Sequence, residues 1–548
     1  MLHPVPHLPR IKTGRQWLAN PLVTSQLRMQ KRYSGINAIV RITSETQDKK
    51  SMQSSPVRTI GSVITLAFIF AISGCGVSKA ATQNPASAPQ SATAAVPTSP
   101  ALPPNTISYA VEKTEPVSAI AHHYLPQSSV MLASDLETQI RNVNHLPEKQ
   151  LYVKKGQTLL IPCIEPQPIV EHSVPMAKDE EVRAIYLTGA MAGSAKGIKI
   201  IQHWHEVGGN SVVFDIKDSD GSLSVPFEDA LAPHNHRAIP NLPKFVRYLH
   251  SMNLHAIARI ALFRDEHIAR DHSELAVQSR STRQPWRENG KLVWTDTSNP
   301  QVQEYDIALA KWVAKSGADE IQFDYVRFPA EGNQADAKFH FQTAHPDWKR
   351  ADVIADFLDR AYQQLHPEGV LVSLDVFGIM AWQRNVDLAH TGQDIVRMAK
   401  YCDVLSPMIY PSHFFGMDGY AHPGDEPEHF IGTSMVRFET ITAGSGVVIR
   451  PWLQAFSWRT KSYSPQYILR QVSTARDQGG IGFLFWNARN DYSKPYLAMP
   501  TMQAHADKYF GKRPPQIAVT AAVTEKKHPK ATVKLAKAKQ AATVPLAK

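Results

Sequence analysis

The sequence predicts an α/β protein whose largest part is a (β/α)₈ barrel, and three observations support this. Between about residues 180 and 511, short apolar runs alternate with helical stretches, as they do in proteins built from parallel βα units. About eight such runs occur. Roughly 330 residues are also a suitable length for eight units with loop insertions. An open doubly wound sheet is the alternative, although residues 188–194 resemble a phosphate-binding loop only weakly.

Each expected strand is a short apolar or alternating run bounded by turn residues. Helices are expected between neighbouring strands, for example at 197–207 and 302–314. The strands are expected at 184–187, 211–216, 255–262, 320–326, 370–376, 404–409, 447–454 and 482–486.

The most informative run covers residues 319–329, where apolar and polar residues alternate with the period of a strand. The C-terminal ends of barrel strands open onto the active face. We therefore expect Asp324 to lie in the site and Glu320 to lie deeper in the barrel. A structural role for Asp324, as a cap or as the partner of Arg327, is the alternative.

The N-terminal region has the layout of a secretion signal. Residues 52–75 contain a basic residue, a short apolar run, small residues and then Cys75. The run is too short to span a bilayer. This region resembles a bacterial lipoprotein signal, which implies that Cys75 carries a lipid. Residues 1–51 are then a mis-called start or a disordered extension, since Met52 begins an ordinary signal; a membrane anchor with a basic cytoplasmic tail is the alternative.

Composition divides the rest of the chain. Residues 76–106 are rich in Ala, Pro, Ser and Thr and predict a linker, whereas the Lys- and Ala-rich residues 512–548 predict a disordered tail. Residues 107–165 predict a small α+β module. Its closing run, 153–162, resembles the end of a LysM module, a family that binds glycans such as peptidoglycan. A spacer that keeps the fold without binding glycan is the alternative, because residues 115–117 depart from the family pattern.

Charge and cysteine content exclude some classes of function. The net charge of +10 comes partly from the tail, where no aromatic residue interleaves with the lysines, so no nucleic-acid partner is expected. Besides Cys75 the chain has only Cys163 and Cys402, which are too few for a disulfide framework. The His-X-His sequences at 203–205 and 234–236 lack a carboxylate at a metal-binding spacing, and we expect neither a metal nor another cofactor.

Polar and aromatic residues follow the expected strands at one end of the barrel. A carbohydrate site needs such a set, because sugar rings stack on aromatic side chains while their hydroxyls need fixed donors and acceptors. The residues expected to bind substrate are Asp215, Lys217, Arg264, Asp296, Arg327, Tyr410, His413, Gln454, Trp486 and Asn487.

The motifs around these positions resemble those of DUF4015, a family of glycoside-hydrolase-like TIM barrels, over about residues 181–505. The matching segments, besides the run that holds Asp324, are 213–218 with Gly221, 259–265, 294–300, 405–413, 450–456 and 482–487. The resemblance implies a TIM barrel that hydrolyses glycosidic bonds.

Such hydrolysis needs one ionised carboxylate and one protonated carboxylic acid. We predict Asp324 as the ionised group, with its pKa held low by Arg327 and Arg264. We predict Asp375, on the next strand, as the acid. The stereochemical outcome stays open.

The environment predicted for Asp375 is apolar, since Phe377 and Trp382 would raise its pKa. Three other carboxyl groups compete for the role of acid. They are Asp215, Asp218 and Asp296.

Together these features predict a monomeric, lipid-anchored enzyme of the cell envelope, at the outer membrane or in the periplasm if the cell has an outer membrane. Its substrate would be a polysaccharide, either peptidoglycan or an exopolysaccharide, near which the LysM-like module would hold it. A non-catalytic glycan-binding barrel is one alternative. A polysaccharide deacetylase is another, and it would need a catalytic metal.

Overall fold

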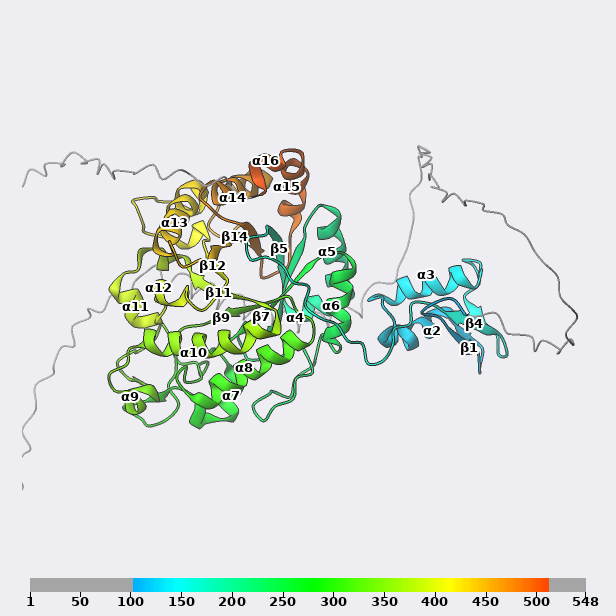
Figure 1. The fold of residues 1–548 in the computed structure, drawn as a ribbon, viewed down its shortest axis with the longest axis horizontal. Helices are drawn as coiled ribbons and strands as arrows, with labels where there is room; N and C mark the ends of the chain where they lie inside the picture. The colour runs from blue at the N-terminus through cyan, green and yellow to red at the C-terminus, as the bar shows by residue number, and fades with distance from the viewer. Residues whose placement is uncertain (1–101, 512–548) are drawn as a thin grey trace, which may run out of the picture. The chain divides into compact units, whose positions relative to one another are not determined.

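The computed structural model describes residues 102–511 and contains a closed parallel barrel surrounded by helices (Figure 1). The barrel strands are β5 (Val182–Leu187), β6 (Ser211–Lys217), β7 (His255–Ala261), β9 (Glu320–Asp324), β11 (Leu371–Phe377), β12 (Val404–Met408), β14 (Trp452–Gln454) and β15 (Gly482–Trp486). Neighbours follow the order β11-β9-β7-β6-β5-β15-β14-β12, and β11 pairs with β12 to close the ring. The predicted (β/α)₈ barrel is confirmed, and the open doubly wound sheet is not formed.

Every predicted strand lies within two residues of its observed bounds. One strand is interrupted: the run predicted at 447–454 consists of β13 (Val448–Ile449) and β14, both paired with β12. Pro451 lies at the break, where a residue without an N–H cannot donate to the ladder.

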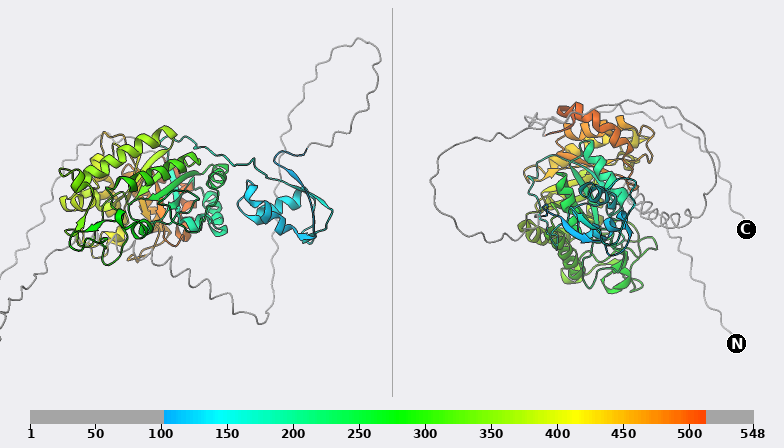
Figure 2. Two further views of the ribbon diagram at one scale, coloured as in Figure 1. Left: turned by 90° about the horizontal axis from the view of Figure 1, so that it is seen from below. Right: turned by 90° about the vertical axis from the view of Figure 1, so that its right-hand side faces the viewer.

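Helices lie outside the strands in all three views (Figures 1 and 2). Several begin with a polar N-cap followed by proline at the first turn, as at Asn299 before α8 and Ser464 before α14. The longer helices are α5 (Ala195–Glu206), α6 (Leu242–Ser251), α8 (Pro300–Lys315), α10 (Arg350–Leu365), α13 (Pro427–Ile441), α14 (Pro465–Asp477) and α15 (Ser493–Ala504). The short ones are α4 (Gly189–Ala192), α7 (Glu266–Asp271), α9 (Phe341–Ala344), α11 (Asn385–Thr391), α12 (Ile395–Met398) and α16 (Ala506–Tyr509).

Two insertions pair with each other outside the barrel. The strand β8 (Gln278–Ser279) follows β7 in the chain, and β10 (Ala337–Lys338) follows β9. They form a two-stranded antiparallel sheet, so the connections that leave two neighbouring barrel strands are joined.

The residues before the barrel form a small α+β unit with a core of its own. Its apolar core includes Val117, Ile120, Leu136, Ile140 and Ile161. Its elements are β1 (Ile107–Ala110), β2 (Glu115–Pro116), α2 (Val117–Tyr124), α3 (Ala133–Val143), β3 (Tyr152–Val153) and β4 (Thr158–Ile161). The module is α+β as predicted, and its resemblance to LysM stays a prediction.

Other predictions fall outside the described residues. They concern the extension at 1–51, the signal with Cys75, most of the linker and the tail from 512. Within 102–511, no helix combines the length and the apolar character needed to cross a membrane.

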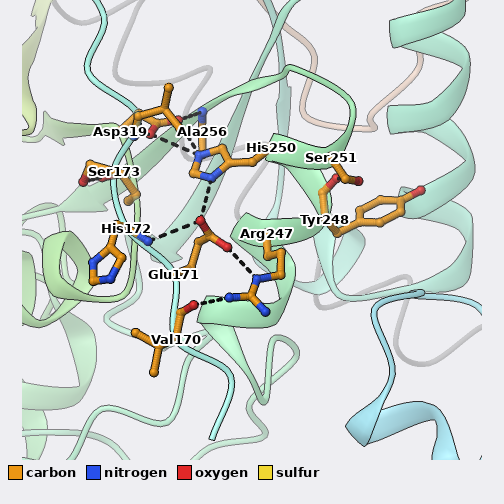
Figure 3. Close-up of polar contacts among 12 residues, drawn as sticks. Val170, Glu171, His172, Ser173, Arg247, Tyr248, His250, Ser251, Ala256 and Asp319 are labelled. Atoms are coloured by element: carbon orange, nitrogen blue, oxygen red, sulfur yellow. Dashed lines mark hydrogen bonds and ion pairs between the residues drawn. The ribbon is translucent and has the colours of Figure 1, made fainter. Parts of the chain in front are cut away.

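A short segment before β5, residues 170–174, is linked to the N-terminal ends of the barrel strands by a series of charged side chains (Figure 3). Glu171 accepts a hydrogen bond from Arg247 Nε at 2.7 Å and lies 3.3 Å from His250 Nδ1. On its other side, His250 Nε2 lies 2.9 Å from Oδ2 of Asp319. Asp319 also accepts from the amides of Val174 and Ala256. One histidine therefore joins the segment to the start of β9.

The pKa of His250 follows from these contacts. Burial acts to lower it, but the hydrogen bonds and charges of Asp319 and Glu171 outweigh burial and raise it above its usual value. A raised histidine pKa means that the stabilisation is fully present below the unfolded pKa, about 6.5, and is lost as pH rises through the higher folded value.

We expect His250→Gln to lower the free energy of unfolding of the full chain by roughly 1–3 kcal/mol at pH 5.5, with a smaller loss at pH 9. Urea unfolding followed by tryptophan fluorescence measures this, since nine of the ten tryptophans lie between Trp204 and Trp486. The control is His205→Gln, an exposed residue of α5, which should change stability by less than about 0.5 kcal/mol. An equal loss at both pH values would contradict the charged contact.

Candidate active site

One arginine organises the middle of the barrel. Arg259, on β7, donates from Nη1 to Oδ1 of Asp215 on β6 and from Nη2 to Oδ2 of Asp324 on β9, each at 2.5 Å. Its Nε lies 3.7 Å from Oδ2 of Asp375 on β11. All four side chains are buried, and none is more than 9% exposed. We call these four residues the aspartate–arginine cluster.

Asp375 is the group in this cluster that is placed to hold a proton. Burial and then the charge of Asp324 raise its pKa well above the usual value. The Arg259 charge and a 2.6 Å hydrogen bond from Trp452 Nε1 oppose that rise without cancelling it. Two carboxyl groups on one guanidinium cannot both ionise easily, so Asp375 keeps its proton to a higher pH than an ordinary carboxyl group does.

Asp215 is a second titratable group of the cluster. Burial raises its pKa to about 7, even though Arg259 and the hydroxyl of Tyr186 favour its charged form. Tyr186 donates to Oδ2 of Asp215 at 2.5 Å. Asp215 therefore changes charge close to neutral pH.

Aromatic rings line the neighbouring part of the barrel. Trp486, which is half-buried, stacks against Tyr410 and Tyr186, with centroids 5.6 and 6.5 Å apart and interplanar angles of 29° and 28°. Phe456 meets Trp486 edge-on at 5.4 Å. Burial and the charges of Asp375 and Asp324 raise the pKa of Tyr410 well above its usual value, so its hydroxyl remains a donor beside the carboxylates. We call Tyr186, Tyr410, Phe456 and Trp486 the aromatic wall.

A backbone turn fixes the direction of Asp324. Tyr325 directly after β9 has φ 55°, which is rare for a bulky residue and marks local strain. Its amide donates to Oδ1 of Asp324 at 2.6 Å. Both oxygens of Asp324 are thus engaged, one by this amide and the other by Arg259.

The partner predicted for Asp324 was wrong. Arg327 instead lies among aromatic rings, 4.8 Å from the centroid of Trp294 and 4.6 Å from that of Phe377. Arg264 donates to the carbonyl of Ser219. The left-handed turn carries the chain away from the cluster, and Arg259 takes the place predicted for these arginines.

The predicted surroundings of Asp375 also need correction. Phe377 packs on the guanidinium of Arg327, and Trp382 packs against an arginine of α13. The pKa of Asp375 is raised by burial and by Asp324, and its aromatic neighbour is the hydrogen-bond donor Trp452.

Lys217 is not brought into the cluster. Its ammonium is fully buried and lies 2.7 Å from Asp306 Oδ1 and 3.1 Å from Asp265 Oδ2. The pairing of β6 with β7 shifts register between Asp215 and Lys217, and the lysine ends beside α8. It is unavailable to a ligand and serves instead as a buried ion pair.

Gln454 and Asn487 support the loops of the site. Gln454 Nε2 donates to the Phe456 carbonyl at 2.9 Å, and its Oε1 accepts from the Ser412 amide at 3.2 Å. Asn487 Nδ2 donates to the Ala455 carbonyl at 2.5 Å and to the Asp491 carbonyl at 2.9 Å. Both amides are committed to backbone, so they position the aromatic wall.

The remaining two predicted residues, His413 and Asp296, lie outside the cluster. His413 is buried, and its pKa is lowered to about 3 by burial, so the ring is neutral; it packs 5.3 Å from Tyr410. Asp296 accepts from the amides of Ser298 and His340 and lines a separate hollow formed by the insertions.

Below the cluster lies a second charged layer. Glu320 accepts from Arg450 Nη1 at 2.8 Å and lies 3.1 Å from His255 Nε2. Burial alone would raise the pKa of Glu320, but the Arg450 charge and the His255 hydrogen bond lower it to about 2. As predicted, Glu320 sits deeper in the barrel than Asp324.

Sequence reasoning missed Arg259, Tyr186 and Trp452. A signal for the first was present, since Arg259 interrupts an otherwise apolar strand. Strands of a parallel barrel are covered on both faces, so an arginine within one must meet buried carboxylates.

Comparison with known proteins supports the barrel. The family DUF4015, described as "Putative glycosyl hydrolase domain", matches residues 184–492. A hypothetical protein from Ruminiclostridium thermocellum has 32% identity over 35% of this chain and 97% of that chain, with a TM-score of 0.29. No curated protein matches the sequence.

Two further proteins of known structure are similar at lower sequence identity. The PgaB (BpsB) glycoside hydrolase domain from Bordetella bronchiseptica has 15% identity over 61% of this chain and 100% of that chain, with a TM-score of 0.44. The spore cortex-lytic enzyme SleL from Bacillus megaterium QM B1551 has 13% identity over 75% and 89%, with a TM-score of 0.36.

We expect Arg259→Leu to lower the free energy of unfolding by about 3–5 kcal/mol at pH 8, because buried carboxylates lose their counter-ion. The loss should shrink at pH 5. The raised pKa of Asp215 means that the folded protein binds this proton more tightly than the unfolded chain, and protonated carboxyl groups need no cation. Urea unfolding of the wild type and the variant at pH 8 and pH 5 measures this change in the free energy of unfolding.

The matched control is Arg287→Leu, an exposed arginine on the first insertion, which should change stability by less than about 0.5 kcal/mol. A loss in Arg259→Leu that does not depend on pH would show that the arginine contributes packing alone.

Proposed function

The chain belongs to the DUF4015 family of glycosyl hydrolase domains, and we propose that it hydrolyses the glycosidic bonds of a polysaccharide with Asp324 and Asp375 as the catalytic pair. The observation that carries this proposal is the sharing of Arg259 by two carboxyl groups on adjacent strands, one of them with a strongly raised pKa. Glycoside hydrolysis needs such a difference between two carboxyl groups.

The pair divides the work of bond cleavage. Asp375 donates its proton to the glycosidic oxygen as the bond to the anomeric carbon breaks, so the leaving sugar departs as a neutral alcohol. Asp324, ionised, either attacks the anomeric carbon or removes a proton from the attacking water. Arg259 and the Tyr325 amide hold Asp324 in one orientation for either role.

The aromatic wall supports a sugar substrate. Trp486 is half-buried, whereas the two tyrosines that stack on it are buried, so Trp486 is the most exposed residue of the group. The apolar face of a pyranose ring stacks on such a surface. Asp215 and the Tyr410 hydroxyl supply polar groups beside it.

A non-catalytic glycan-binding barrel is the second candidate. The deep burial of Asp215, Asp324 and Asp375 and their engagement by hydrogen bonds favour it, since catalytic groups must reach the substrate. Turnover and binding measured side by side separate the two candidates.

We expect reducing-end release by the full chain from a panel of bacterial polysaccharides that includes peptidoglycan. Asp324→Asn and Asp375→Asn should each lower kcat by roughly 10²–10⁴-fold. Activity should fall at alkaline pH as the raised pKa of Asp375 is passed, and this limb should be absent from the residual activity of Asp375→Asn.

The control for both is Asp356→Asn, an exposed residue of α10, which should keep full activity. Glycan binding by the wild type without turnover would favour the binding barrel. Full activity in Asp324→Asn would mean that another carboxylate is the nucleophile or base.

We also propose that the enzyme works at the cell envelope, anchored by a lipid on Cys75 and held near its polymer by the LysM-like module. The support is the sequence pattern at 52–75 and at 153–162. We expect the wild type to enter the membrane fraction and to incorporate a radiolabelled fatty acid, and Cys75→Ala to do neither, whereas Cys163→Ala should behave as the wild type. Membrane association that survives in Cys75→Ala would refute the lipid anchor.

A further inference from the structure

The two insertions that pair through β8 and β10 form the walls of an open hollow of about 810 Å³. Both insertions follow the C-terminal ends of adjacent strands, β7 and β9, which is the end of the barrel that carries the active face. The hollow is therefore formed on the same face as the catalytic pair. Its volume is in the range of pockets that bind small molecules or sugar units.

The frame of this hollow is held by hydrogen bonds between the insertions. Asp296 Oδ2 accepts from the His340 amide at 2.6 Å, and Ser298 Oγ accepts from the Phe341 amide at 3.0 Å. On the other side, the Asp336 carboxylate accepts from Ser279 Oγ at 2.7 Å. These contacts hold the two insertions in a fixed arrangement around the hollow.

Positive charge dominates its lining. Arg280, Arg283 and Lys338 all line the hollow, and no ion pair joins any of them to a carboxylate within residues 102–511. The Arg280 guanidinium donates to Oε1 of Gln342, which leaves Arg283 and Lys338 as the cations available to a ligand. Only two carboxyl groups line it. Glu274 is exposed, and Asp296 is buried with both oxygens occupied by hydrogen bonds.

Neutral hydrogen-bonding groups complete the lining. The Thr343 hydroxyl, Nδ2 of Asn299 and Oε1 of Gln278 are groups of the kind that bind sugar hydroxyls, whereas Asn299 Oδ1 caps α8 and Gln278 Nε2 donates to backbone carbonyls. Guanidinium and ammonium groups without an ion-pair partner, as at Arg283 and Lys338, prefer carboxylate or phosphate oxygens. A ligand that satisfies both sets is a sugar unit that carries an anionic group.

We propose that this hollow binds an anionic unit of the polysaccharide, so that the polymer cleaved in the barrel is an acidic one. This inference rests on the proposed function, which it extends by naming the class of substrate. The anionic group is a carboxylate or a phosphate, and Arg283 and Lys338 are the residues that recognise it.

The test measures binding rather than turnover, so that it does not depend on catalysis. Isothermal titration of the full chain carrying Asp324→Asn would compare tetragalacturonic acid with its methyl ester, which removes the charge and keeps the sugar, and with poly(glycerol phosphate). We expect binding of an anionic probe at least roughly tenfold tighter than binding of the neutral ester, with an affinity that falls as salt rises.

The variant Arg283→Ala with Lys338→Ala should lose this preference, whereas Lys196→Ala with Lys199→Ala, two exposed lysines of α5, should keep it with the same change in net charge. Preference for the uronate or for the phosphate polymer identifies the source of the anion. Equal binding of acid and ester, retention of the preference in the first double variant, or no binding of any probe would overturn the proposal.

The test of the catalytic pair is independent of the binding test of the hollow. Absence of turnover together with a charge preference that depends on Arg283 and Lys338 would refute the hydrolase and leave the anionic subsite standing. Turnover of neutral polymers with no charge preference would support the hydrolase and refute the anionic subsite.

Discussion

The interior of this barrel depends on the neutralisation of buried carboxylates by a single guanidinium. Arg259 is held by three strands at once, and each of its nitrogens faces an aspartate. A lysine could not replace it, because an ammonium is a point charge without the planar fork that reaches several carboxylates. The positions of Asp215, Asp324 and Asp375 relative to one another are thus set by one rigid side chain.

Burial and charge then decide which carboxyl group keeps its proton. The arginine offers one positive charge to three acids, so the cluster cannot be fully ionised without leaving uncompensated charge in the interior. The deeper layer differs, since Glu320 has both Arg450 and His255 beside it and stays ionised, with a pKa lowered to about 2. The same barrel therefore holds a carboxylate that stays ionised, Glu320, and above it two carboxyl groups with raised pKa values, Asp215 and Asp375.

The positions of the strands and of the aspartates at their ends were predictable, because alternation and turn residues report burial directly. Asp324 and Asp375 lie where strand-end reasoning put them. The contacts made by the side chains were harder to predict from the sequence. Tyr325 adopts a left-handed conformation that no local pattern announces and that redirects Arg327, and a register shift in β6 turns Lys217 toward α8. Both depend on partners far away in the sequence, as does the pairing of β8 with β10.

That pairing has a consequence for how the family can diversify. The hollow between the insertions is assembled from segments outside the barrel strands, whereas the aspartate–arginine cluster is made from the strands themselves. Insertions on the surface tolerate changes in length and sequence, while a packed barrel does not. Under the proposed function, changes in the insertions would alter which polymer is selected and leave the aspartate–arginine cluster intact, since the two proposed sites lie on separable pieces of the fold.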